Sequence, residues 1–228
     1  MAKSSLKVHI PQEASPDALL RLVALMYKSG VTFPNVKSFL EFSHEHGIGS
    51  RTELQIFGTT CRLLERSTKG VIRLSSEGSA VAQSRHEIQA DLVHFLIYTG
   101  WADNSRDKAE LWAYREVVDF LWNNASVEVL SVSSAINEEI RNKAFGLFEE
   151  DVSFSLKSIR GIRKWLEATI PPTIAEDRFS RRFFCPPELA LLACGWVAQR
   201  THGELGIDFL LTPERRDMIC RICLIDPI

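Results

Sequence analysis

Hydrophobic positions recur at helical spacing along most of the chain, and the first helix they predict is the most apolar. Residues 16–28 (PDALLRLVALMYK) leave only Asp17, Arg21 and Lys28 on one polar strip. A helix that is apolar on nearly every side lies at the centre of a domain. Gly30 follows shortly after and can end this helix. The pattern therefore predicts a central helix over residues 16–28.

A second and a third helix follow, joined by a short turn. Residues 34–46 are apolar on one face, and Gly47 can end this helix in the left-handed conformation. Ser50 and Glu53 form a capping box, Ser-x-x-Glu, which opens a helix over residues 51–66. Two helices joined by a glycine-containing turn of this length are typical of a helix-turn-helix.

The predicted third helix has two distinct faces. Its buried stripe consists of Leu54, Phe57, Cys61 and Leu64. A separate sector carries only Arg51, Gln55, Thr59, Arg62 and Arg66. Arginine can bind phosphate or guanine, glutamine can bind adenine, and threonine suits base edges or phosphate. A solvated helix face would have a similar composition. Nucleic-acid contact is favoured because the strip has no acidic residue, with Glu53 and Glu65 expected to point elsewhere.

A short β-hairpin is predicted after the third helix. Residues 67–70 (STKG) form a turn, and residues 71–74 (VIRL) form a strand with Ile72 and Leu74 on one side. Residues 75–78 (SSEG) end the strand and cap a fourth helix, which we expect over residues 79–99.

Two short patterns in this region carry a resemblance. Leu63-Leu64-Glu65, followed by Leu74-Ser75-Ser76-Glu77-Gly78, is similar to the end of a recognition helix and the close of a short β-wing. Residues 16–83 therefore resemble the winged helix-turn-helix DNA-binding superfamily. The resemblance implies a recognition helix in the major groove of double-stranded DNA and a wing on the flanking backbone, although many winged helices contact proteins instead. The DNA contacts predicted in this part are Arg51, Thr52, Gln55, Thr59, Arg62, Arg66, Lys69 and Arg73.

The second half repeats this order of elements without repeating its letters. Helices are predicted over residues 105–124, 133–149 and from about 155 to 169, followed by an arginine-rich hairpin that ends near residue 184. We expect a second, degenerate winged helix over residues 105–184, or otherwise an irregular helical domain. Two final helices are expected over residues 186–200 and 213–225. Further phosphate contacts are predicted at Lys157, Arg160, Lys164, Arg178, Arg181 and Arg182.

These elements predict a mainly α fold in two parts. Residues 1–100 would form the winged-helix domain with its C-terminal linking helix, and residues 101–228 would form the helical domain. The net charge is −2, but residues 1–90 carry 11 basic and 8 acidic residues, whereas the remainder carries 16 and 21. A mildly basic first half is compatible with nucleic-acid contact.

The start of the chain lacks an apolar signal segment, and the longest apolar run, residues 189–198, is about half of what a membrane span needs. We therefore expect no membrane partner and a cytoplasmic location with reduced thiols.

No catalytic motif is apparent. The chain has no phosphate-binding loop, dinucleotide fingerprint, His-Glu-x-x-His or Gly-x-Ser-x-Gly, and we expect neither catalysis nor a cofactor. Asp208 and Glu214 faintly resemble a nuclease cluster, but the segment fits a helix cap better. His86 and His94 are expected to be structural. Core packing is the favoured role of four cysteines, Cys185, Cys194, Cys220 and Cys223. Ligation of zinc or of an iron–sulfur cluster is the less favoured role.

The sequence predicts a non-catalytic DNA-binding protein, a transcription regulator that uses the helix of residues 51–66. The alternative is an adaptor subunit of a larger nucleic-acid-processing or phage-defence complex, in which the winged helix docks a protein. The net charge of −2, the acidic second half, the apolar end of the sequence and the apolar run of residues 189–198 favour this alternative. A homodimer or a larger partner is compatible with both. A third class, a small-molecule-sensing regulator, depends on the tryptophans, which we expect to be core residues.

Overall fold

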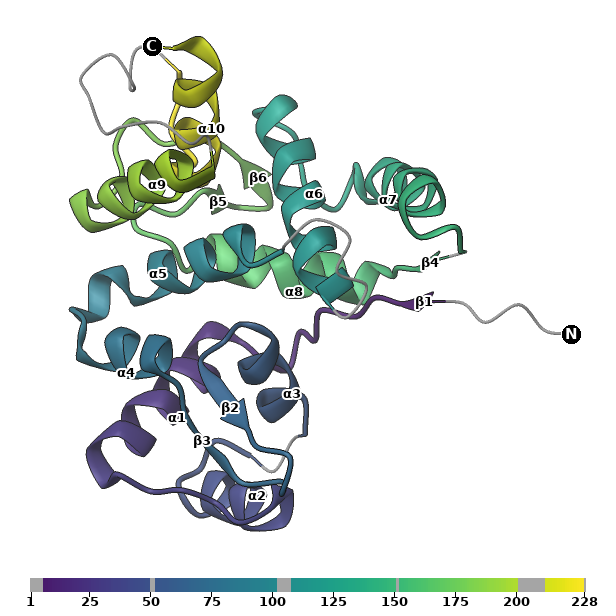
Figure 1. The fold of residues 1–228 in the computed structure, drawn as a ribbon. Coiled ribbons are helices and arrows are strands. Elements are labelled where there is room, and N and C mark those ends of the chain that lie inside the picture. Colours follow the sequence, from purple (N-terminus) through teal and green to yellow (C-terminus); the bar gives the residue numbers. More distant parts are fainter. Residues whose placement is uncertain (1–5, 50–51, 102–107, 151, 201–211, 228) are drawn as a thin grey trace, which may run out of the picture.

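The computed structural model describes residues 6–49, 52–101, 108–150, 152–200 and 212–227, and within these ranges the protein is mainly α-helical (Figure 1). The helices α1–α4 lie together in the lower half of Figure 1, while α5 and α8 cross above them. Each described β-strand pairs with one other strand to form a short two-stranded sheet. The mainly α class expected from the sequence is confirmed.

Residues 16–74 form three helices and a hairpin. Helix α1 spans Pro16–Ser29, α2 spans Val36–Glu45 and α3 spans Thr52–Thr60. Strands β2 (Leu64–Arg66) and β3 (Ile72–Leu74) pair in antiparallel fashion. Phe33, between α1 and α2, pairs with Ile72 of β3 through two backbone hydrogen bonds of 2.8 Å each. The turn between the first two helices is thus tied to the hairpin.

The third helix is shorter than the sequence predicts. It ends at Thr60 rather than near residue 66, because Arg62 adopts a left-handed backbone (φ 65°) and turns the chain into β2. The Leu63 N–H donates to the Gly58 carbonyl at 2.9 Å, which closes the end of the helix. Leu63 and Leu64 are both buried. Because the chain turns here, both of these neighbouring leucine side chains are buried. In a continuous helix, adjacent positions would not share one buried face.

The fourth predicted helix, over residues 79–99, is two helices. Helix α4 spans Ser76–Gln83, and α5 spans His86–Thr99. Ser84 has an extended backbone, and its side chain donates to the Val81 carbonyl at 2.7 Å. Gln89 of α5 also donates to the Val81 carbonyl, at 3.1 Å. These bonds satisfy the C-terminal carbonyl of α4 and allow α5 to leave in a new direction.

The start of α4 is fixed against the end of α3. The Ser75 N–H donates to the Leu63 carbonyl at 3.1 Å, and the Ser75 hydroxyl donates to the Arg62 carbonyl. The same hydroxyl accepts the Gly78 N–H at 2.8 Å. A Cβ atom at Gly78 would overlap the Leu63 carbonyl oxygen. Glycine is therefore required where α4 meets the turn that begins the hairpin.

The second half is built from the remaining helices. Helix α6 spans Ala109–Asn123, α7 spans Ser133–Phe148 and α8 spans Leu156–Glu167. The predicted start of α6 at residue 105 lies outside the described residues. Strands β5 (Ile174–Ala175) and β6 (Arg178–Phe179) form an antiparallel pair. Helices α9 (Pro187–Arg200) and α10 (Pro213–Cys223) complete this half and pack against each other.

The segment before α1 belongs with the second half of the chain. Strand β1 (Leu6–Lys7) pairs in parallel with β4 (Val152–Ser153). The Ile10 N–H then donates to the Ser158 hydroxyl at 3.3 Å, and Gly161 of α8 lies against the Ile10 carbonyl. Helix α5 contacts α1 and α4 as well as α6, α8, α9 and α10. The buried apolar side chains therefore form one continuous cluster across the expected boundary near residue 100, and the division into 1–100 and 101–228 stays a prediction.

Replacing Gly78 with alanine tests the junction between α3 and α4. Because the new methyl group would displace the Leu63 carbonyl, we expect Gly78→Ala to lower the free energy of unfolding by about 1–3 kcal/mol. Gly146 in α7 has nothing within 4 Å of its would-be Cβ, so Gly146→Ala should instead raise stability by roughly 0.5–1 kcal/mol. Urea denaturation measures both. Equal effects of the two substitutions would contradict the tight junction.

Candidate nucleic-acid interface

The exposed side of α3 faces a depression whose charged lining is basic. Thr52 is exposed, Ile56 is 58% exposed, and Thr59 and Thr60 are half-buried. The depression is lined by Gln55, Ile56, Thr59, Thr60, Arg62, Arg66 and Lys108. No carboxylate belongs to this set of described residues. A surface with these properties can receive an anionic ligand.

One described residue predicted on this face does not contribute to it as expected. Gln55 is buried, at 5% exposure, so its predicted base contact is wrong. Its side-chain amide donates to the Thr59 hydroxyl at 3.1 Å, and that hydroxyl donates to the Gln55 carbonyl at 2.9 Å. The polar groups are therefore satisfied within α3. Arg51 lies outside the described residues.

Two arginines of the hairpin region form ion pairs with nearby glutamates. Arg62 pairs with Glu77 of α4, and Arg73 pairs with Glu65 at 2.8 Å across the hairpin. Glu65 was expected to point away from the basic surface. It lies directly opposite Arg73, because residues 64–66 form a strand and not a helix. A hydrogen bond from Ser76, followed by the contact with Arg62, lowers the pKa of Glu77.

Both pairs are accessible to solvent. The Arg73 and Glu65 side chains are 62% and 46% exposed. Exposed pairs of this kind contribute about 0–1 kcal/mol, so a phosphate group could replace either carboxylate at low cost.

Arg66 and Lys69 are the most available cations of this surface. Both are exposed, and neither has an ion-pair partner among the described residues. Arg66 ends β2 and lines the depression, whereas Lys69 lies in the turn of the hairpin. Arg66 therefore extends the basic lining beside α3, and Lys69 adds an exposed cation in the turn of the same hairpin.

The basic strip predicted on α8 is present at the surface. Lys157, Arg160 and Lys164 are exposed, and Lys164 donates to the Gln12 carbonyl at 3.0 Å. Helices α3 and α8 lie close together where the Phe57 and Trp165 rings are 6.1 Å apart. The strip lies on the opposite side of α8 from Trp165, Ile162 and the other buried residues.

The arginines around the second hairpin have different roles. Arg178 is exposed and pairs with Glu128 at 3.5 Å. Arg181 is half-buried: its guanidinium donates to the Trp122 carbonyl at 2.9 and 3.0 Å, lies 4.3 Å from the centre of the Trp122 ring and pairs with Asp226 at 2.8 Å. These bonds hold Arg181 within the fold.

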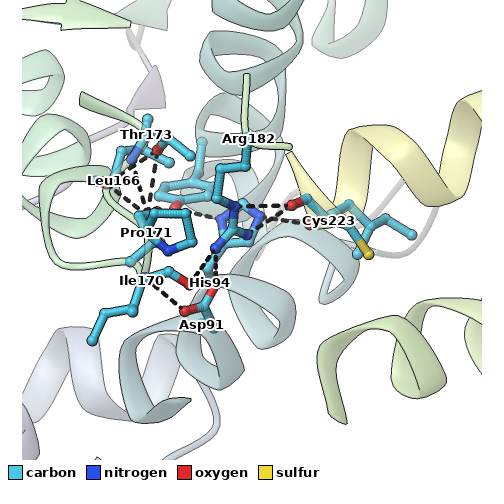
Figure 2. A network of polar contacts seen from close by, with 11 residues as sticks. Asp91, His94, Leu166, Ile170, Pro171, Thr173, Arg182 and Cys223 are labelled. Atoms are coloured by element: carbon cyan, nitrogen blue, oxygen red, sulfur yellow. Dashed lines mark hydrogen bonds and ion pairs between the residues drawn. The ribbon is translucent and has the colours of Figure 1, made fainter. Parts of the chain in front are cut away.

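Arg182 is buried, so its predicted contact with DNA is wrong. Its guanidinium forms an ion pair of 2.6 Å with Asp91 of α5, and both side chains are at most 1% exposed (Figure 2). It also donates to the Cys223 carbonyl at 2.7 and 3.2 Å and to the Ile170 carbonyl at 3.2 Å. Burial raises the pKa of Asp91, while Arg182 and the Ile170 N–H, at 3.0 Å, oppose that rise.

His94 completes this buried network. Its Nε2 lies 3.0 Å from the Ile222 carbonyl and must donate to it, so Nδ1 accepts from the Tyr114 hydroxyl at 2.9 Å. Burial, followed by the charge of Arg182, lowers the pKa of His94 to about 3. His94 is a structural residue. No group of three potential metal ligands occurs within the described residues, and the cysteines are free thiols.

Three residues of the depression are not among the contacts predicted from the sequence. Ile56 and Thr60 belong to neither of the two faces predicted for this helix. Lys108 is more than 40 residues away along the chain, at the start of α6, and only the tertiary fold brings it to α3. Its sequence position carries no signal for this role.

Comparison with family models, with curated proteins and with solved structures finds no significant match to this chain. Among the described residues, no helix has both the length and the apolar character needed to cross a membrane.

Replacement of Arg182 tests whether it is structural. Arg182→Met leaves the Asp91 carboxylate buried without its partner, and we expect a loss of about 3–5 kcal/mol in the free energy of unfolding. Arg178→Met removes an exposed pair and should cost less than about 0.5 kcal/mol. Chemical denaturation of the two variants provides the comparison. Equal stability of the two variants would show that the buried ion pair of Arg182 with Asp91 does not stabilise the fold.

Proposed function

We propose that the protein is a non-catalytic DNA-binding protein and that residues 16–83 are a winged helix. The observation that carries this proposal is the depression beside α3, whose charged lining consists of Arg62, Arg66 and Lys108. A concave surface bordered by cations is suited to the phosphate backbone of a duplex.

The order of elements supports the winged-helix assignment. Three helices precede a two-stranded hairpin, and Phe33 adds a third backbone segment to that hairpin through Ile72. Thr52 and Ile56 of α3 are exposed in the described part of the chain. A helix of nine residues is long enough to place its first two turns in a major groove.

The proposed contacts divide into two kinds. Thr52 and Ile56 lie on the exposed side of α3, where a hydroxyl can bond a base edge and an apolar side chain can contact a thymine methyl group. Arg66 and Lys69 contact phosphates, and Arg62 and Arg73 can exchange their glutamates for phosphates. Two to four phosphate contacts of this kind correspond to a salt slope of about −2 to −4.

Removing the two unpaired cations tests this surface. We expect Arg66→Gln with Lys69→Gln to weaken binding to a labelled mixed-sequence DNA duplex and to reduce the magnitude of the salt slope by about 2. Fluorescence anisotropy over a series of salt concentrations measures both quantities.

The control variant, Lys37→Gln with Arg141→Gln, loses the same charge at exposed positions on α2 and α7. It should keep the slope of the parent. A parent chain that does not bind duplex DNA, or a double variant with the parental slope, would exclude this surface as a DNA interface.

One observation favours the adaptor function as the second candidate. Phe183 is 94% exposed and Phe184 is 65% exposed, just before α9, and Leu191 of α9 is 74% exposed. Exposed apolar residues are ordinary when they are scattered, but aromatic and aliphatic side chains grouped within one short stretch are typical of protein interfaces.

Substitution of this apolar surface distinguishes the two candidates. If it docks a protein, Phe183→Ser with Leu191→Ser should lose a stoichiometric partner that the parent retains in affinity purification, with DNA binding unchanged. Phe145→Ser, at an exposed phenylalanine of α7, should retain that partner. Identical partners for all three proteins would exclude docking at this surface.

A further inference from the structure

A hollow lies between α9, α10 and the last described residues of the chain, in the upper part of Figure 1. Its volume is about 610 Å³, and sites for small molecules typically enclose about 300–1,000 Å³. Its described walls come from Cys194 of α9, residues 213–220 of α10 and residues 225–227. This C-terminal hollow shares no described lining residue with the depression beside α3.

Three segments of the chain form the walls of the C-terminal hollow. Helix α10 contributes one of its faces, because most of its lining residues recur every three or four positions. Helix α9 packs against α10 and contributes Cys194. Residues 225–227 contribute the third wall, after the chain turns at Leu224, whose backbone is left-handed (φ 57°). The shape of the hollow therefore depends on how these three segments are held together.

Backbone hydrogen bonds fix the third wall in place. The Arg182 N–H donates to the Leu224 carbonyl at 2.7 Å, and the Asp226 N–H donates to the Arg182 carbonyl at 2.9 Å. The Ile225 N–H also donates to the Cys220 carbonyl of α10, at 3.0 Å. Because Arg182 is itself held by the buried ion pair with Asp91, the hollow is formed before any ligand enters. A preformed site loses little conformational entropy when it binds.

Most of the described walls are apolar. Pro213, Ile219 and Ile225 contribute aliphatic surface, and Cys194 and Cys220 contribute half-buried free thiols. Removal of this surface from water by an apolar ligand would be favourable, at about 25 cal/mol for each Å² that is buried. The walls thus favour a ligand with an apolar body.

The two carboxylates of the lining are already paired with arginines. Asp217 accepts from Arg221 at 2.7 Å, and Asp226 accepts from Arg181 at 2.8 Å. Both guanidinium groups also lie 4.3 Å from the centre of the Trp122 ring, which holds them in place. A cationic ligand would therefore have to displace a guanidinium group that is bound on two sides.

Arg216 is the lining cation that remains available. Its side chain is exposed, and it has no ion-pair partner among the described residues. A guanidinium group binds a carboxylate through two parallel hydrogen bonds, a geometry that an ammonium group does not offer. The charge of the hollow thus selects an anionic head group, while its walls select an apolar body.

We propose that the C-terminal hollow binds a small organic acid, with its apolar body against Ile219 and Ile225 and its carboxylate on Arg216. The site goes beyond the proposed DNA interface and does not depend on it. The exposed apolar surface at Phe183 and Leu191 is not part of the lining, so substitutions there provide a control for nonspecific apolar binding.

Octanoate and 1-octanol test the two parts of the proposal, because they share an apolar chain and differ in the head group. Isothermal titration calorimetry with the reduced full-length chain should find one octanoate site. Arg216→Gln should weaken octanoate binding about tenfold, in line with the loss of a charged hydrogen bond, and should leave the affinity for 1-octanol unchanged. Arg141→Gln, at an exposed position of α7, should bind both compounds like the parent.

The two thiols of the lining locate the ligand in the parent protein without any substitution. Saturating octanoate should slow the alkylation of Cys194 and Cys220 by N-ethylmaleimide, as measured by peptide mass spectrometry. Cys185 is half-buried and lies outside the described lining, so its rate should not change.

Four results would overturn the proposal. They are a parent that does not bind octanoate, equal alkylation rates with and without it, an Arg216→Gln variant that loses octanoate and 1-octanol binding equally, and loss of octanoate binding in Phe183→Ser with Leu191→Ser. None of these measurements involves DNA, so they stand or fall separately from the proposed function.

Discussion

The buried ion pair between Asp91 and Arg182 is the interaction on which the second half of the molecule depends. Removing both charges from water is costly, and this cost is offset only because each remaining polar group of the pair has a partner. Asp91 also accepts the Ile170 N–H, and Arg182 also donates to the Ile170 and Cys223 carbonyls. Four separate segments therefore have one position in which the charges are satisfied. Helix α5 carries Asp91 and contacts α1 and α4, so this constraint extends to the first half.

The periodic pattern of apolar residues was sufficient to predict most helices. Helices α1, α2, α7, α8 and α9 lie within a few residues of their expected ranges, because each buries a stripe that is visible in the sequence. The prediction was wrong for the end of α3, since Leu64 fits both a helical stripe and the inner side of a strand. It was also wrong for α4 and α5, where the break depends on side-chain bonds from Ser84 and Gln89. The contact between Gly78 and Leu63 orients this region, and it cannot be predicted from the local pattern of residues.

The candidate interface shows the same division between local and tertiary information. The exposure of Arg66 and Lys69 could be predicted from the sequence, because both lie in a short polar stretch between buried residues. The pairing of Arg73 with Glu65 depends on strand register, and the burial of Gln55 depends on how α3 packs. Arg182 was assigned to the surface because an arginine is almost never fully buried unless it is paired, and its partner is 91 residues away. An arginine in an apolar stretch can therefore be a core residue when a distant carboxylate reaches it.

The pairing of the N-terminal segment with α8 and β4 also affects how the chain is made. Ile10 bonds to Ser158, a residue that lies 148 positions later. At about 5–20 residues per second, a ribosome needs roughly 7–30 s to synthesise that interval. During this time the segment before α1 has no partner strand, while α1 and the hairpin can already pack. Residues 6–10 are thus synthesised well before the residues that they pair with, and their docking must wait for the second half of the chain.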